Sequence, residues 1–148
     1  MKHILFITAI LAMSACGNVN FDPPSGFVEK YKTNNSLVVV SADASRIRVT
    51  YKENKKNGTA EFWGELLKRE LTKFKAYKMV KSDSYKSKGM IMEFEPPEMY
   101  KGFVYTVAVL ANDDDVYVIE LGCDKKSCPE KRKAFDKLVK KVYNKKIK

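Results

Sequence analysis

The stretch Phe103-Val-Tyr-Thr-Val-Ala-Val-Leu110 decides the fold of this 148-residue chain. It is apolar on both faces, and its valines and aromatic residues favour β-structure. It therefore predicts a central strand over residues 103–111. The polar run Asn112-Asp-Asp-Asp115 follows and predicts a hairpin loop, because short polar side chains favour turns. The next strand, over residues 116–121, is then its neighbour.

Four other segments are typical of strands. Residues 36–43 contain Leu37-Val-Val-Val40, and residues 46–52 alternate apolar with polar side chains, which indicates a strand with one wet face. Residues 77–81 and 90–95 are short, rich in β-formers and separated by turn residues. The chain therefore predicts six strands.

Two amphipathic helices complete the pattern. The first is expected over residues 60–76 with Thr59 as its N-cap, and its apolar stripe consists of Phe62, Leu66, Leu67, Leu71 and Phe74. The second is expected over residues 129–145 after a capping box of Ser127 and Glu130, and its apolar side consists of Phe135, Leu138, Val139, Val142 and Tyr143. The order β-β-α-β-β-β-β-α predicts an α+β fold, an antiparallel β-sheet with two amphipathic helices packed on it.

The first sixteen residues have the features of an export signal. Lys2 is followed by an apolar run over residues 4–13, which is too short to span a bilayer, and then by the small residues Ser14 and Ala15. The cysteine that follows, Cys16, resembles the lipobox of bacterial lipoproteins, in which it is diacylated and becomes the new N-terminus. Met13 departs from the leucine that this family prefers. An ordinary cleaved signal and an uncleaved N-terminal helix are the alternatives, and both also export the chain.

These features divide the chain into three parts. We expect a lipoprotein signal peptide at residues 1–15, the lipidated Cys16 with a flexible tether at residues 16–26, and a single α+β domain at residues 27–148. The tether is expected because residues 17–26 are polar, contain Pro23 and Pro24 and lack an apolar period. The domain would then lie on the extracytoplasmic side of a bacterial envelope membrane, inner or outer.

Lipidation of Cys16 leaves Cys123 and Cys128 as a pair. Their spacing differs from the Cys-x-x-Cys of redox and zinc sites, and no second pair exists to complete a metal shell. In an oxidising compartment a local disulfide is expected. The alternative is two free thiols.

The order of the elements resembles the PsbP-like fold, which is shared by extrinsic photosystem subunits, a Ran-binding nuclear import factor and the DcrB-type bacterial envelope lipoproteins. The likeness is carried by the helix over residues 62–74, Tyr77-Lys-Met-Val-Lys-Ser82, the strands Phe103-Val-Tyr-Thr-Val-Ala-Val109 and Val116-Tyr-Val-Ile-Glu-Leu121, and the closing helix around Phe135. It covers about two thirds of the chain and implies a PsbP-like sandwich that binds without catalysis. The cysteine pair and the basic C-terminal end depart from that pattern.

Positive charge gathers at the C-terminal end. The chain carries a formal charge of +10, and residues 124–148 hold eleven basic against three acidic side chains. The last helix should present Lys133, Lys137, Lys140 and Lys141 away from its apolar side. For a protein tied to a bilayer, the nearby anions are lipid headgroups and envelope polymers, so we expect an anionic surface and no nucleic acid as partner. The alternative is a solvated face without a ligand.

One loop has the composition of a contact surface. Residues 95–102 combine a rigid proline pair with Met99 and Tyr100, side chains that favour contact surfaces. We expect these two residues to contact a partner protein.

The composition removes several kinds of catalysis. The only histidine is His3, within the expected signal, and the chain has no nucleophile elbow, phosphate loop or dinucleotide fingerprint. We expect no metal, no cofactor and no catalytic residue. Asp113, Asp114 and Asp115 lack the spacing of a calcium loop and suit a hairpin tip.

The sequence therefore predicts a lipid-anchored envelope protein that binds another envelope macromolecule or an anionic surface without catalysis. Two other classes stay open. One is a carboxylate-dependent hydrolase, since Glu93 and Glu95 share a strand face as paired glycosidase carboxylates do. The other is a small-molecule carrier with a pocket between sheet and helices. The pattern leaves the oligomeric state open.

Overall fold

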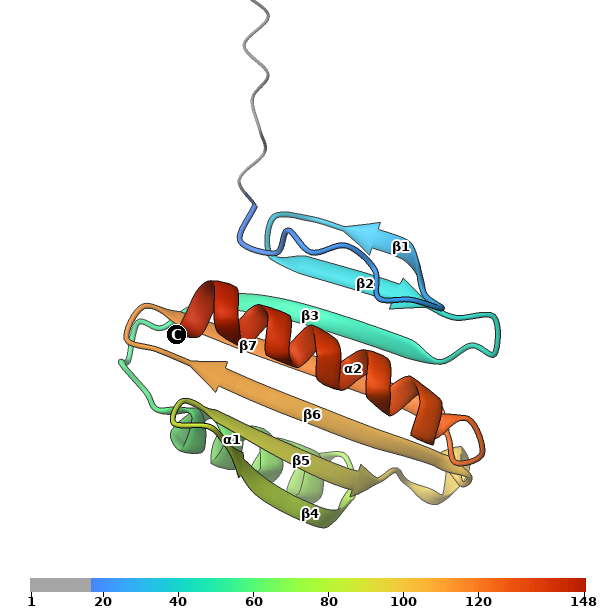
Figure 1. Cartoon of the computed structure of the whole chain (residues 1–148). Helices are drawn as coiled ribbons and strands as arrows, with labels where there is room; N and C mark the ends of the chain where they lie inside the picture. The colour runs from blue at the N-terminus through green and yellow to red at the C-terminus, as the bar shows by residue number, and fades with distance from the viewer. Residues whose placement is uncertain (1–16) are drawn as a thin grey trace, which may run out of the picture.

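The computed structural model describes residues 17–148, which form one seven-stranded antiparallel sheet with a helix on each face (Figure 1). The strands lie in the order β1-β2-β3-β7-β6-β5-β4. Their bounds are β1 (Val28–Lys32), β2 (Ser36–Val40), β3 (Arg46–Glu53), β4 (Lys78–Tyr85), β5 (Gly89–Glu95), β6 (Phe103–Ala111) and β7 (Asp115–Asp124). The helices are α1 (Ala60–Arg69) and α2 (Cys128–Val142), and each continues into a π-helical turn, Glu70–Phe74 and Tyr143–Ile147. The α+β fold class is confirmed.

β6 lies near the middle of the sheet, and its side chains enter two cores, one on each face. Val107 and Val109 join the core beneath α1, whereas Ala108 and Leu110 join the core beneath α2. All four are fully buried. The predicted central strand, apolar on both faces, is confirmed.

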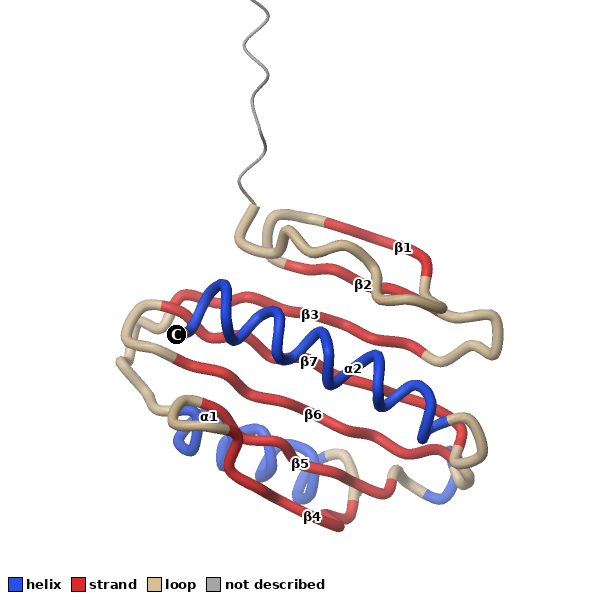
Figure 2. The backbone as a smooth tube through the Cα atoms, viewed as in Figure 1, coloured by secondary structure: helices blue, strands red, loops and turns tan. Residues whose placement is uncertain are grey.

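α2 lies across one face of the sheet, as Figures 1 and 2 show. The predicted apolar side is confirmed, and it packs against strand residues that include Ile47, Ile119 and Leu121; the buried helix residues are Phe135, Leu138, Val139, Val142 and Tyr143. Burying side chains of this size stabilises the fold by about 1.5–3 kcal/mol each. Among residues 17–148, no helix has the length and apolar character needed to cross a membrane.

The start of α2 differs from the predicted capping box. Ser127 has φ −93° and ψ −12°, and its side chain makes no capping hydrogen bond. An N-cap side chain reaches the first turn from an extended backbone, which Ser127 does not have. Its carbonyl instead accepts the N–H of Lys131 at 3.2 Å. The helix therefore begins at Cys128, with Pro129 in its first turn, where a missing N–H costs nothing.

α1 packs on the other face, but it is rotated from the predicted orientation. Leu71 is buried and Leu67 half-buried as expected, while Phe62, Leu66 and Phe74 are exposed. The reason is Gly64, where an added Cβ would lie 2.5 Å from Sδ of Met90. The side of the helix with small residues, Ala60 and Gly64, approaches the sheet closely. The predicted N-cap is confirmed, because Oγ1 of Thr59 accepts the N–H of Phe62 at 3.1 Å.

The sequence pattern missed the edge strand β1. It pairs antiparallel with β2, and all five of its residues, Val28-Glu-Lys-Tyr-Lys32, are exposed. An edge strand without a buried face lacks the alternation by which strands are recognised, and its charged residues protect the free edge from pairing with other chains. The sheet consequently has seven strands, one more than predicted.

Residues 17–26 do not form the expected flexible tether. Val19 and Phe21 are 1% and 2% exposed and lie in the core beneath α2. The N–H of Val19 donates to the carbonyl oxygen of Asn34 at 3.0 Å, and the hydroxyl of Tyr117 donates to the carbonyl oxygen of Asn18 at 2.9 Å. The two apolar side chains, Val19 and Phe21, are enough to dock the segment on the domain. Two residues are too few to form a periodic pattern that could be recognised in the sequence. The chain enters the domain beside the turn between β1 and β2.

Candidate functional site

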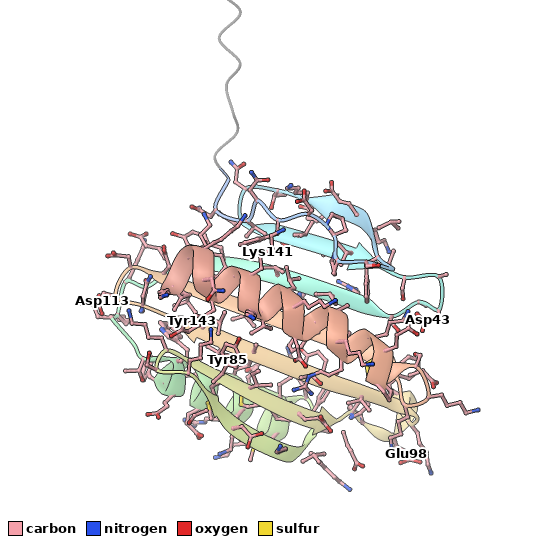
Figure 3. The ribbon with its side chains drawn as sticks, viewed as in Figure 1. Asp43, Tyr85, Glu98, Asp113, Lys141 and Tyr143 are labelled. Carbon is pink, nitrogen blue, oxygen red and sulfur yellow. A yellow bond between two sulfur atoms is a disulfide. The ribbon has the colours of Figure 1, made fainter. Side chains whose placement is uncertain are left out.

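The lysine face of α2, defined as Lys133, Lys137, Lys140 and Lys141, lies opposite the buried side of the helix. Lys133, Lys137 and Lys140 are exposed, and among the described residues none of the three pairs with a carboxylate. Lys141, which Figure 3 labels on α2, is half-buried. Its Nζ lies 3.6 Å from a carboxylate oxygen of Asp22. The nearest acidic residue on the helix, Asp136, is engaged by Arg132 at 2.9 Å. The face therefore presents net positive charge to whatever lies against it.

The docked N-terminal segment lies beside the C-terminal half of this helix. Asp22 meets Lys141, and Val19 and Phe21 share a core with Tyr143 and Ile147. The point where the chain enters the domain and the lysine face are therefore on the same side of the sheet. Cys16 and the expected signal peptide lie outside the described residues, so lipidation stays a prediction.

Cys123 and Cys128 lie at disulfide-bonding distance, with their Cα atoms 5.2 Å apart. The pair links the end of β7 to the first residue of α2. Cys123 is fully buried, and Cys128 packs against the same core. This geometry agrees with the expected disulfide.

The predicted contact loop is accessible. Met99 and Tyr100 lie in a 3₁₀ turn, Glu98–Tyr100, and their exposed fractions are 81% and 54%. The loop precedes β6, at the end of that strand opposite the hairpin loop at Asn112. Within residues 17–148 both side chains are largely open to solvent, and their contact with a partner stays a prediction.

The carboxylates singled out by the sequence pattern have ordinary roles in the fold. Glu93 lies 3.4 Å from Arg132 of α2, and Glu95 lies 4.0 Å from Lys125. Both sit on the α2 side of β5 and pair with different cations. At the hairpin tip, Oδ1 of Asn112 accepts the backbone N–H groups of Asp114 and Asp115 at 3.0 and 2.7 Å, so the acidic run closes a turn.

On the opposite face of the sheet, beside the end of α1, is a basic cavity of about 290 Å³. This cavity was not predicted from the sequence. Arg46 and Arg48 on β3 line it together with Tyr105 on β6 and Glu120 on β7; Leu71, Lys75, Tyr77 and Gly122 complete the lining. Three adjacent strands and the turn after α1 therefore form its walls.

A network across those three strands organises the cavity. Nε and Nη2 of Arg48 donate to the two carboxylate oxygens of Glu120 at 2.5 and 2.7 Å, and the hydroxyl of Tyr105 donates to the same carboxylate. The bond to Glu120 raises the pKa of Arg48. Burial, and then the charge of Glu120, raises the pKa of Tyr105, which keeps its proton. The carboxylate is thus held in place and neutralised, and Arg46 is left with no carboxylate partner among the described residues.

One signal in the sequence points to this cavity. The chain has only four arginines among its basic residues. Two of them, Arg46 and Arg48, lie two residues apart and therefore share one face of a strand, while the apolar Ile47 between them points to the other face. Arginine has a planar fork that matches carboxylate and phosphate groups, which lysine lacks. The contribution of β7 could not be predicted, because Glu120 and Gly122 come next to these arginines only through the register of β3 with β7.

No protein-family model and no curated protein matches the sequence. Among solved structures, the fold is similar to the solution structure of cyanobacterial PsbP (CyanoP) from Synechocystis sp. PCC 6803, with a TM-score of 0.53 and 11% identity over 79% of this chain and 81% of that chain. At this identity the likeness shows the fold alone. The expected PsbP-like α+β fold is therefore confirmed.

Proposed function

We propose that this chain is a lipid-anchored bacterial cell-envelope protein, similar to the DcrB-type lipoproteins, that acts as a non-catalytic binding module. Its ligand is the anionic headgroup layer of the membrane that holds its Cys16 anchor. The observation that carries the proposal is the lysine face of α2, whose Lys133, Lys137 and Lys140 are exposed and pair with no described carboxylate.

The docked N-terminal segment supports this choice of ligand. Cys16 is three residues from the buried Val19, a distance of at most about 10 Å in extended chain. A lipid on Cys16 would hold the domain against the bilayer, on the side of the sheet that carries the lysines. Each lysine near an anionic membrane contributes about 1 kcal/mol, so a lipid and a basic face reinforce one another.

A role without catalysis is supported by the chemistry of the side chains. The only histidine lies at position 3, and Glu93 and Glu95 each lie beside a cation. The exposed Met99 and Tyr100 are left free for a second envelope macromolecule. A photo-crosslinker at position 99 in intact cells would identify that partner, with position 79, an exposed methionine on β4, as the matched control.

Vesicle binding tests the proposal. Residues 17–148, which contain both cores, are mixed with vesicles of anionic or neutral lipid at low and high salt. We expect binding to anionic vesicles that weakens as salt rises, since the Debye length is about 10 Å at 0.1 M and about 3 Å at 1 M. Replacing Lys133, Lys137, Lys140 and Lys141 with Gln should remove most of this binding while preserving helix propensity.

A control variant carries the same change in charge elsewhere. Lys30, Lys56, Lys73 and Lys78 are exposed, lie outside α2 and pair with no described carboxylate. Their replacement with Gln should leave most of the binding. Equal binding by the two variants would show that net charge alone is responsible and would refute a site on α2.

A further inference from the structure

We propose that the basic cavity on the α1 side of the sheet binds the phosphate group of a small phosphorylated organic molecule. This site lies on the face of the sheet opposite the lysine face, so the inference is independent of membrane binding. It rests on the position of Arg46, the open space above Gly122 and the charge balance of the cavity.

The register of the sheet places Arg46 across an opening. Arg46 pairs with Gly122, and Gly122 pairs with Tyr105 on the next strand. Gly122 has no side chain, and a Cβ added there would meet no atom within 4 Å. Gly122, which lies between Arg46 and Tyr105 in the sheet, therefore leaves a space in the surface. A ligand group can lie there beside Arg46 without displacing any side chain.

The charges of the lining favour an anion. Arg46, Arg48 and Lys75 line the cavity with Glu120 as the only carboxylate in its lining. Arg48 and Tyr105 already hold Glu120, and Lys75 lies 3.6 Å from Glu70 outside the lining. An arginine that faces an open cavity without a carboxylate partner is suited to bind phosphate through its two parallel N–H groups.

The remaining walls favour an organic group attached to the phosphate. Leu71 is apolar, and the ring centroid of Tyr77 lies 5.2 Å from the ring centroid of Tyr105. Burial raises the pKa of Tyr77, so its hydroxyl remains a donor. At about 290 Å³ the cavity is at the small end of ligand pockets, which span about 300–1,000 Å³. A phosphomonoester with one ring fits these properties.

The experiment is a titration of the full chain, purified in mild detergent, with phenyl phosphate, inorganic phosphate and benzoate. Calorimetry measures affinity, and amide chemical shifts of Gly122 and Tyr105 report the place of binding. We expect phenyl phosphate to bind saturably and to shift both amides. Benzoate, with one charge, and inorganic phosphate, without a ring, should each bind more weakly. Equal affinity for benzoate would overturn the assignment to phosphate, and equal affinity for inorganic phosphate would overturn the organic ligand.

Four variants complete the test. Arg46→Gln should weaken phenyl phosphate binding by about tenfold, as expected for loss of a charged hydrogen-bonding group. Gly122→Val should fill the opening and reduce binding further, and Gly122→Ala should have a smaller effect while keeping the fold. Arg69→Gln removes the same charge from an exposed site outside the cavity and should change nothing. The proposal fails if no ligand saturates the chain, or if Arg46→Gln and Arg69→Gln behave alike.

Discussion

The backbone N–H of Val19 donates a hydrogen bond to the carbonyl oxygen of Asn34 at 3.0 Å. This bond joins the start of the described chain to the turn between β1 and β2. Because Val19 is also buried beneath α2, the segment next to Cys16 is part of the folded domain. A lipid on Cys16 would consequently determine which side of the domain faces the bilayer.

The docked segment should contribute to stability. Phe21→Ala removes a ring that is 2% exposed, and we expect it to lower the free energy of unfolding by about 3–5 kcal/mol, as for other buried aromatic residues. Phe74→Ala, at a ring that is 71% exposed, should change it by less than about 1 kcal/mol. Urea unfolding monitored by circular dichroism measures both. Equal effects of the two substitutions would indicate that residues 17–26 behave as a free tether.

Membrane retention should depend on Cys16. In cells supplied with labelled fatty acid, the wild-type chain should carry label and sediment with membranes, whereas Cys16→Ser should do neither, because the acyl chain is attached through the thiol. Cys128→Ser provides a control for loss of a cysteine. The anchor hypothesis is wrong if Cys16→Ser still incorporates label.

Cys123 and Cys128 should be oxidised in protein isolated from the envelope. Its unreduced mass should be about two hydrogens below its reduced mass, since each thiol loses one. Reduction should lower the stability by roughly 2 kcal/mol, because the bridge closes only a short loop. Rapid alkylation of both thiols without reductant would contradict the prediction.

The network around Glu120 predicts a loss of stability at high pH. Burial and the Glu120 carboxylate raise the pKa of Tyr105 above the ordinary value of 10.0. Above pH 10 the unfolded state therefore loses this proton before the folded state does, so stability is complete below pH 10 and falls as pH rises. Tyr105→Phe should make the fall in unfolding free energy between pH 10 and 11 shallower, by up to about 1.4 kcal/mol per pH unit. Identical slopes for Tyr105→Phe and the unsubstituted chain would refute the role of Tyr105.

The parts of the fold that the sequence predicts well are those with a complete periodic pattern. β6 is apolar throughout, and α2 repeats apolar side chains from Phe135 to Tyr143, so hydrophobic burial alone specifies their orientation. The position of α1 in the chain was predicted correctly, but its rotation about the helix axis was not. Gly64 turns toward the sheet because it approaches Met90 closely, and this contact is between residues far apart in the sequence. β1 and the docked segment carry too few buried side chains to form a pattern.

The candidate sites divide in the same way. The lysine face of α2 follows from helical spacing, so its exposure could be predicted. The basic cavity depends on the pairing of Arg48 with Glu120, which are 72 residues apart, and on the register that brings Gly122 beside Arg46. Strand register between distant segments is a tertiary property that local sequence does not encode.

The most direct test of membrane binding through α2 measures which side of the anchored domain meets the bilayer. Lys137→Cys on α2 and Lys78→Cys on β4 each replace one exposed lysine, and each is labelled with a fluorophore in the lipidated chain on anionic vesicles that carry a quencher in the headgroup layer. We expect strong quenching at position 137, reduced by salt while the chain stays on the vesicles, and weak quenching at position 78. Equal quenching at the two positions, or stronger quenching at position 78, would contradict membrane binding through α2.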